Sequence, residues 1–249
     1  MISVQSRDKW QGALYSLVVV LFVWWLVSWL FRLPIIPSPV AVFLNIAEVF
    51  STKMEVHVLY SLGRIIGGIA LSILIGVPLG YLMGAFAGVN RLLSPLVYFT
   101  YPVPKLALLP VVMLLFGLGE TSKLIMIVLI VVFQIIVTSR DAVMSIPQEI
   151  FRSLRSLGAS RLQMFTEIIL PASLSEVLTA TRLALGTAVS ILFFTETFGT
   201  EYGMGYFIMD AWLRVDYLDM YGGIVVLSLM GFFLFTLIDL IDQRLSSWR

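Results

Sequence analysis

The chain has 249 residues, of which 59% are hydrophobic and 12% are charged, with a formal net charge of +1 at pH 7. A typical soluble chain is about 45–50% apolar and about 25% charged, so this one has too little polar surface to cover a water-soluble globule. The mean hydropathy of +0.99 indicates a membrane protein, the near-neutral charge excludes the basic footprint of a nucleic-acid-binding protein, and the absence of cysteine excludes disulfides and thiolate metal sites.

Six stretches are long and apolar enough to cross a bilayer, which takes about 20 residues of helix. They cover residues 10–31, 58–88, 92–119, 124–140, 175–196 and 220–241. The third contains Pro102, Pro104 and Pro110, so it is expected to be a broken or re-entrant helix. No repeat and no hydrophilic linker divides the chain. The expected fold class is therefore all-α, a single transmembrane domain over residues 1–249 with six membrane helices.

Between the first two spans, Ser38-Pro39 opens a short apolar run that predicts an interfacial helix on the outer face. The loops give the orientation, because cytoplasmic loops carry an excess of Lys and Arg. With both termini inside, nine such residues lie in the inner segments and four or five in the outer ones. The inner residues are Arg7, Lys9, Arg91, Arg140, Arg152, Arg155, Arg161, Arg244 and Arg249.

The second span carries small residues at four-residue spacing, and residues at this spacing share one face of a helix. They are Gly68, Ser72, Gly76, Gly80, Gly84 and Gly88. In lipid, small residues allow two helix backbones to approach closely. The stripe therefore predicts tight packing against another span, with Gly76, Gly80 and Gly84 as packing residues. The alternative is a seam along which two helices slide during transport.

The longest polar stretch, residues 145–171, lies on the inner side in this orientation. Ser145 with Gln148, and Ser160 with Gln163, each match the S-x-x-Q capping box that begins a helix. The stretch is thus predicted to form two short helices outside the membrane. Such a pair is either an ordinary interfacial loop or a docking element for a cytoplasmic partner.

The ends of these two helices are also marked in the sequence. Gly158 is placed to end the first in a left-handed turn, and the second is expected to stop at Pro171. The first helix would carry Phe151, Leu154 and Leu157 along one side. If this side faced the cytosol, a groove on a partner protein would be its natural cover.

Four ionisable residues lie at membrane depth, where charges usually face a cavity or a partner. They are Arg64, Lys105, Arg182 and Glu196. Arg64 is near the outer end of its span and can snorkel to the interface. Arg182 lies 11 residues past Pro171, about 16 Å into its span. It is expected to face a cavity or to pair, with Glu176 or Glu196 as partner.

The other two charges have two readings each. Lys105 follows Pro102 and Pro104, so it either caps the break in the helix or faces the pathway of a transported solute. Glu196 lies between Thr195 and Thr197 at the outer end of its span. We expect it to act as a gate or to hydrogen-bond between helices.

Residues 152–171 read RSLRSLGASRLQMFTEIILP and resemble the EAA loop of ABC-importer permeases, E-A-A-x-x-x-G-x(9)-I-x-L-P. The glycine and the I-x-L-P end match at the required spacing. Further pieces resemble the branch that imports nitrate, sulfonates, taurine and related solutes. These pieces are LPIIPSPVAV (33–42), SLGRIIGGIALSILIGVPLGYLMG (61–84), YPVPKLALLPVVMLLFGLGETSK (101–123), TRLALG (181–186) and GMGY (203–206). The resemblance covers residues 33–244.

The resemblance implies that this chain is the permease of an ATP-driven, binding-protein-dependent importer in the cytoplasmic membrane of a prokaryote. It would form a homodimer, with two cytoplasmic ATPase subunits and an external solute-binding protein. ATP and magnesium would bind in the ATPase, with no cofactor in this chain, and the solute would be a small anion such as a sulfonate, taurine or nitrate. Neutral heterocyclic nutrients are handled by the same branch.

The resemblance also assigns roles to residues. Coupling to the ATPase would fall to Glu149, Phe151, Arg152, Leu154, Arg155, Leu157, Gly158, Ala159 and Pro171. The translocation pathway or gate would include Pro102, Pro104, Lys105, Arg182 and Glu196. Arg152, Ser153 and Leu154 stand where the family has Glu, Ala and Ala. Either the carboxylate has moved one helical turn earlier, to Glu149, or the partner surface has changed sign.

Other classes of function lack their signatures. No P-loop motif is present, so ATP hydrolysis would belong to a separate subunit. The single histidine, His57, excludes a histidine-rich metal site, and no nucleophile–base pair supports a membrane-embedded enzyme. A stand-alone secondary transporter or channel remains as the alternative. A secondary transporter is expected to consist of two related halves, and the sequence shows no internal duplication.

Overall fold

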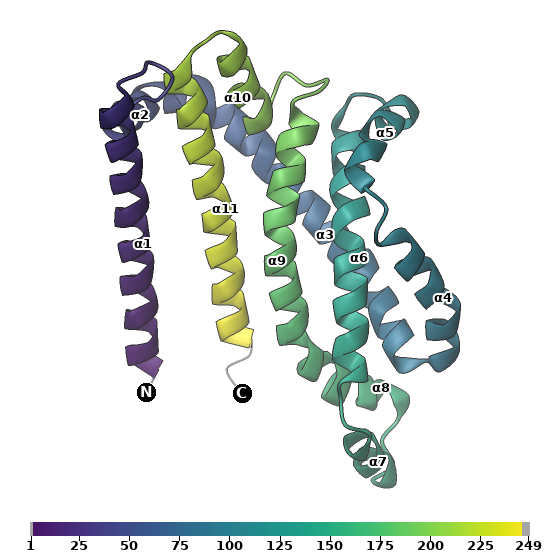
Figure 1. The fold of residues 1–249 in the computed structure, drawn as a ribbon. Coiled ribbons are helices and arrows are strands. Elements are labelled where there is room, and N and C mark those ends of the chain that lie inside the picture. Colours follow the sequence, from purple (N-terminus) through teal and green to yellow (C-terminus); the bar gives the residue numbers. More distant parts are fainter. Residues whose placement is uncertain (1, 246–249) are drawn as a thin grey trace.

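Every regular element in the described part of the chain is a helix (Figure 1). The computed structural model describes the backbone of residues 2–245 and the side chains of residue 12 and residues 15–245. The expected inner charges at Arg7, Lys9 and Arg249 lie outside the described side chains. The α-helices are α1 (Ile2–Phe31), α2 (Pro39–Val49), α3 (Glu55–Ala85), α4 (Ala87–Thr100), α5 (Leu109–Phe116), α6 (Glu120–Met144), α7 (Gln148–Ser156), α8 (Arg161–Met164), α9 (Leu170–Glu196), α10 (Met204–Leu213) and α11 (Tyr217–Leu245).

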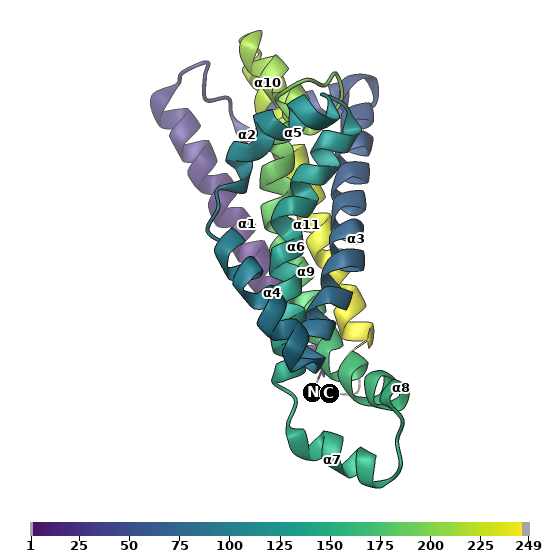
Figure 2. The same ribbon diagram turned by 90° about the vertical axis from the view of Figure 1, so that its right-hand side faces the viewer.

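The long helices form one upright bundle. In Figure 1, α1, α11, α9 and α6 stand side by side and α3 crosses behind them. Helix α3 packs mainly on α6, α6 on α9, and α9 on α11. Helices α2 and α10 lie at one end of the bundle, and α7 and α8 lie at the other (Figures 1 and 2). Helix α1 begins and α11 ends on the α7–α8 side.

Four helical segments are long and apolar enough to cross a membrane: Pro39–Ala85, Glu120–Met144, Arg161–Glu196 and Tyr217–Leu245. A fifth results if α4 and the helix Lys105–Phe116, which meet at 81°, count as one bent span. The predicted break is thereby confirmed, since Pro102 and Pro104 lie between these two halves. In α1, the described apolar part is Tyr15–Phe31, shorter than the ~20 residues of a full crossing. The structure therefore supports four or five of the six predicted spans.

The second predicted span, residues 58–88, has different limits in the structure. Helix α3 ends at Ala85 because the backbone is extended at Phe86, with φ −123° and ψ 108°. Gly88 therefore lies in α4, and a Cβ there would meet no atom within 4 Å. The predicted stripe of small residues thus ends at Gly84, and including Gly88 in it was wrong. At its other end, α3 continues from α2 through a π-helical turn, Phe50–Met54. The predicted short helix after Ser38 thus runs directly into the span.

The second helix of the 145–171 stretch does not stop at Pro171, as the sequence had suggested. A π-helical turn, Phe165–Ile169, joins α8 to α9, so residues Arg161–Glu196 form one helical segment of 36 residues. Pro171 lies in the first turn of α9. Leu170 N–H donates to the carbonyl of Phe165 in the π-helical turn, and Pro171, which has no N–H to donate, follows it without ending the helix.

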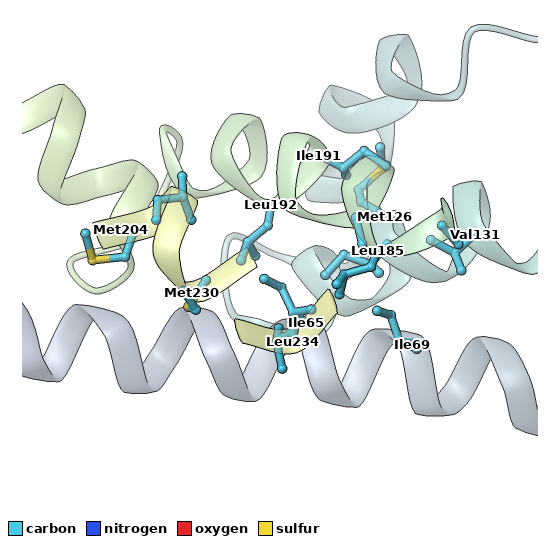
Figure 3. Close-up of a cluster of buried hydrophobic side chains, with 14 of the residues drawn as sticks. Ile65, Ile69, Met126, Val131, Leu185, Ile191, Leu192, Met204, Met230 and Leu234 are labelled. Carbon is cyan, nitrogen blue, oxygen red and sulfur yellow. The ribbon is translucent and has the colours of Figure 1, made fainter. Parts of the chain in front are cut away.

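Aliphatic and methionine side chains fill the space between α3, α6, α9 and α11 (Figure 3). Ile65, Met126 and Leu192 are fully buried in this cluster, and Leu185 and Met230 lie among them. In a bilayer, van der Waals packing rather than exclusion of water holds such helices together. Close contact between the backbones therefore decides which helices associate.

Helices α3 and α6 approach too closely to admit side chains on the facing side of α3. A Cβ built on Gly76 would lie 2.8 Å from Ile135 Cγ2, and one on Gly80 would lie 2.6 Å from the carbonyl oxygen of Ile136. A Cβ on Gly84 would lie 2.6 Å from Val143 Cβ. Real Cβ atoms do not approach other atoms this closely, so only glycine permits this spacing of the two helices.

Candidate functional site

The loop formed by residues 145–171, called here the α7–α8 loop, projects from one end of the bundle (Figure 2). Helix α7 ends at Ser156, and Gly158, two residues later, has a φ of 80°, which lies in the left-handed region. Gly158 N–H donates to the carbonyl of Arg155, and Ala159 N–H donates to that of Leu154, both at 3.1 Å. This pair of bonds is a Schellman motif, so the predicted left-handed turn is confirmed and the angle between α7 and α8 is fixed.

One of the two predicted capping boxes is present. Ser160 Oγ accepts from Gln163 N–H at 3.3 Å, and Gln163 Oε1 accepts from Ser160 N–H at 2.8 Å. The box predicted at Ser145 is wrong. Ser145 ends α6, and its hydroxyl donates to the carbonyl of Ala142. Pro147 occupies the N-cap position of α7 instead, without a side-chain bond.

The apolar residues of α7 do not form one outward stripe, which corrects the expectation from their spacing. Phe151 and Leu154 are half-buried and pack against a small core that includes Ile146, Ile168 and Ile169. Leu157 comes after the last helical residue, and 84% of it is exposed. The loop therefore covers its own core with two of the three side chains and leaves one apolar side chain exposed.

Charged residues cover the rest of α7. Glu149, Arg152 and Arg155 are all exposed, and Glu149 lies in the first helical turn. A pocket of about 500 Å³ lies between this loop and the adjacent ends of α3 and α6, and both Arg155 and Arg161 line it. The exposed surface of the loop thus carries both signs of charge, with Glu149 and Glu167 beside Arg152, Arg155 and Arg161.

The break between α4 and α5 holds Lys105 beside the middle of α6. Its ammonium group donates to the carbonyls of Thr100, at 2.9 Å, and Tyr101, at 3.1 Å. It also lies 4.8 Å from the ring centre of Phe133. Both carbonyls lie at the end of α4, so Lys105 caps the break, as one of its two expected roles requires. It also lines an open hollow of about 320 Å³.

At the end of the bundle opposite the α7–α8 loop, Arg64 is buried rather than extended to the surface. Only 3% of it is exposed. Its guanidinium donates to Glu196 at 2.7 Å and to Glu120 at 2.6 Å, and also to the carbonyl of Tyr202 at 2.7 Å. Arg64 therefore links α3, the start of α6, the end of α9 and the following loop. The expectation that it would snorkel is wrong because two carboxylates compensate its charge inside the protein.

Glu196 is completely buried in this cluster. Its carboxylate accepts from Ser61 Oγ at 2.8 Å and from the N–H of Gly205 at 2.9 Å, as well as from Arg64. Nearby, His57 Nδ1 accepts from the N–H of Gly203 at 3.1 Å. Glu196 thus makes hydrogen bonds between helices, and it holds the start of α10 against α3 and α9.

Ser61 and Glu120 were missed as members of this cluster, although the sequence contains a signal for part of it. Arg64 precedes Gly68 by four residues, so it lies on the same face of α3 as the stripe that packs against α6. A charged side chain on that face needs a partner on α6 or α9. The sequence did not indicate Glu120 as a partner. It is the first residue of α6 and follows a glycine-rich turn, so the sequence alone does not fix where α6 begins or which way Glu120 faces.

Arg182 pairs with Asp239 on α11, not with Glu176 or Glu196. Both partners are partly exposed, at 28% and 34% of the side chain. Chain direction could have identified this pair. Helices α9 and α11 leave and enter the α7–α8 end of the bundle in opposite directions, so the early part of one lies beside the late part of the other. Within the described residues, no group of acidic or histidine side chains could hold a metal ion.

Comparisons with known proteins agree on one family. The model of the "Binding-protein-dependent transport system inner membrane component" family matches residues 72–247. The taurine transport system permease protein TauC of Escherichia coli (strain K12) is 32% identical over 94% of this chain and 88% of that protein. The putative aliphatic sulfonates transport permease protein SsuC of Bacillus subtilis (strain 168) is 29% identical over 98% and 90%. Among solved structures, the inward-facing MetNI methionine ABC transporter matches 76% of this chain and 94% of that chain, with a TM-score of 0.67 and 20% identity.

Proposed function

The chain belongs to the binding-protein-dependent transport system inner membrane components, and on that premise we propose how it assembles, what it couples to and what it carries. It is the non-catalytic permease subunit of an ABC importer and a multi-pass inner membrane protein. The family implies a complex with ATPase subunits and a solute-binding protein. The remaining questions concern stoichiometry, orientation, contacts and solute.

For the assembly, we propose a homodimer with two cytoplasmic ATPase subunits and one external binding protein. The chain would cross the membrane six times as a single domain, with α1 as the first span and both termini in the cytoplasm. Support comes from the 30-residue length of α1 and from the excess of Lys and Arg expected on the inner side. The α7–α8 loop would then be cytoplasmic, and α2 and α10 would face the binding protein.

The α7–α8 loop is proposed as the contact with the ATPase, which would bind ATP and magnesium. The supporting observation is a rigid projection with an exposed tip. Gly158 and Ala159 close the Schellman motif, while Glu149, Arg152 and Leu157 remain exposed. Phe151 and Leu154 would support this surface from within, and Arg155 and Pro171 lie at its margins. A surface held in one conformation loses little entropy on binding.

For the solute, we propose a small anion, namely taurine, another sulfonate or nitrate. The observation that carries this proposal is similarity to a taurine permease over nearly the whole chain. Pro102, Pro104 and Lys105 would line the pathway at the broken span. Arg182 would act there through its pair with Asp239, and Glu196 would hold the outer end in one of its two transport states.

The test is transport by the complete importer in proteoliposomes. The permease is reconstituted with its ATPase and binding protein, and uptake of radiolabelled taurine, methanesulfonate and nitrate is measured with and without internal ATP. We expect uptake of at least one of these anions, dependent on both ATP and the binding protein. Uptake of none of them would contradict the solute proposal. Uptake by the permease alone would contradict the proposed complex.

A further inference from the structure

Two adjoining hollows open at the break between α4 and α5. One, of about 320 Å³, is lined by Tyr101, Lys105, Phe133 and Gln134 among others. The second, also about 320 Å³, is lined by Tyr101, Gln134, Thr138 and Thr187 among others. Because Tyr101 and Gln134 line both, the two hollows adjoin, and together they are called here the break groove.

The break groove lies midway along the bundle. Gln134 is 14 residues after the start of α6 at Glu120 and 10 before its end at Met144. The whole of α6, at 25 residues, is about 38 Å long, so Gln134 lies close to its centre. Figure 2 shows the connection between α4 and α5 beside this part of α6. A polar groove at this depth is costly in a bilayer unless it serves a polar ligand or pathway.

Lys105 differs from Arg64 and Arg182 in its partners. Arg64 pairs with Glu196 and Glu120, and Arg182 pairs with Asp239. Lys105 has two carbonyl acceptors and two aromatic rings but no carboxylate partner in the described part of the chain. An ammonium group has three N–H donors, so one donor has no oxygen acceptor within the described residues, and no carboxylate there neutralises the charge.

Three further polar side chains in the groove are unused. Gln134, Thr138 and Thr187 make no side-chain hydrogen bond within the described structure, although each is half-buried. Hydroxyls elsewhere in the spans donate to the carbonyl four residues earlier, as Thr181 and Ser190 do. Amide and hydroxyl donors left unpaired at mid-depth are available to a ligand, because an unsatisfied polar group in a bilayer costs free energy.

We propose that the break groove is a binding subsite for a small oxyanion, with Lys105 as its cationic ligand and Gln134 and Thr138 as hydrogen-bond donors. A sulfonate or nitrate group offers several acceptor oxygens to these three groups, while Phe133 supplies an apolar wall for the carbon part of a sulfonate. Arg182 is not a ligand of this subsite, because Asp239 already neutralises it. The inference rests on the proposed transport of an anion and identifies where within the permease that anion binds.

Single cysteines provide the test, because the chain has none of its own. Thr187→Cys, which lines the groove but is not one of the three proposed ligands, is made in the full-length permease in lipid nanodiscs, and its rate of reaction with N-ethylmaleimide is measured. The probes are methanesulfonate, an anion, and dimethyl sulfone, a neutral molecule of nearly the same shape. Gluconate keeps the ionic strength equal. Ser228→Cys, in a separate hollow between α9 and α11, is the matched position outside the groove.

We expect methanesulfonate to slow labelling of Thr187→Cys and dimethyl sulfone to have no effect, with Ser228→Cys unaffected by either. Adding Lys105→Gln should raise the methanesulfonate concentration for half-protection about tenfold, the loss expected for one charge-assisted hydrogen bond. Lys105→Arg should retain protection. Arg91→Gln removes an exposed charge from the same bent span and should also retain it.

Protection by both probes, by neither, or equally in Lys105→Gln would overturn the subsite. If Thr187→Cys is unreactive, Val137→Cys, which also lines the groove, is labelled instead. Failure of both positions to react means that the groove is closed to water, which also overturns the subsite. Stimulation of the ATPase by the loaded binding protein is measured separately. If methanesulfonate protects the cysteine but the loaded binding protein does not stimulate the ATPase, the subsite stands and the proposed importer assembly is rejected. If the ATPase is stimulated but the cysteine is not protected, the assembly stands and the subsite is rejected.

Discussion

Arg64 joins four segments of the chain through one guanidinium group. It is buried between Glu196, which is fully buried, and Glu120, which is half-exposed. Removing one partner of a buried ion pair leaves an uncompensated charge, which is far more destabilising than losing the pair as a whole. The contribution of Arg64 to stability therefore lies mainly in allowing Glu196 to be ionised at its position.

We predict that Arg64→Met lowers the free energy of unfolding by about 3–5 kcal/mol, because Glu196 then loses its compensating charge. The double variant Arg64→Met with Glu196→Gln should be more stable than Arg64→Met alone. The measurement is unfolding of the purified permease in mixed micelles at increasing SDS. Arg214→Met is the control, since its pair with Asp210 is exposed and worth about 0–1 kcal/mol. Equal losses for Arg64→Met and Arg214→Met would contradict the prediction.

The sequence identified which side chains were unusual more reliably than it identified their partners. Glu196 was expected to act as a gate or to hydrogen-bond between helices, and Arg182 to face a cavity or to pair. In the structure both form ion pairs with another helix. Their partners, Arg64 and Asp239, were not identified. A partner depends on how two helices are rotated and offset relative to each other, and the hydrophobic pattern of a membrane helix constrains rotation weakly because lipid accepts apolar side chains on every face. Only the glycine face of α3 carried that information.

At the scale of elements, the contact between α3 and α6 depends on the lack of side chains along one face of α3. We predict that Gly80→Leu disrupts this contact, because the added side chain would meet the Ile136 carbonyl and Ser139. The expected loss is about 1–3 kcal/mol of unfolding free energy, together with loss of transport. Gly63→Leu, in the same helix but with nothing within 4 Å of its Cβ position, is the matched control. The same SDS unfolding measurement applies, and equal stability of the two variants would remove the packing role.

The turn at Gly158 permits an equally specific test. We predict that Gly158→Val shifts α7 out of position, since a left-handed conformation costs an L-residue about 1–2 kcal/mol, and more for a β-branched one. Gly158→Asn should be tolerated, because asparagine enters this region readily. Co-purification of the ATPase with each variant is the measurement. If the amount of co-purified ATPase falls for both variants, or for neither, the prediction is contradicted. Docking of the ATPase would then not depend on the backbone conformation at residue 158.

Elements were predicted well where a local rule governs them and less well where two rules compete. The broken third span followed from its prolines, and the Ser160 capping box followed from its spacing. Pro171 was expected to end a helix, but the π-helical turn before it shifts the hydrogen-bond register so that the proline begins α9 instead. Nothing local in the sequence indicates such a turn, since it depends on how α8 packs against the rest of the loop.

At the scale of the whole molecule, the α7–α8 loop has two kinds of apolar side chain. Some pack inside the loop and stabilise the permease, whereas Leu157 is exposed and accessible to an ATPase. We predict that Leu157→Asp weakens ATPase binding about tenfold or more, the loss of one buried leucine contact, without changing permease stability. Leu154→Asp should instead lower stability, because Leu154 packs inside the loop. The measurements are affinity for the ATPase and the SDS unfolding midpoint. An unchanged affinity for Leu157→Asp would show that the exposed tip does not contact the ATPase.

The continuity of Arg161–Glu196 has a mechanical consequence. Helix α9, which makes up 27 residues of this segment, is about 40 Å long, and Glu196 ends it at the Arg64 cluster. A tilt of α9 by about 10° about its loop end would displace the opposite end by about 7 Å, given that length, which is more than a buried ion pair can span. If the α7–α8 loop contacts the ATPase as proposed, a movement of the loop would strain the bond between Arg64 and Glu196, and this pair would set the threshold at which the opposite end changes state.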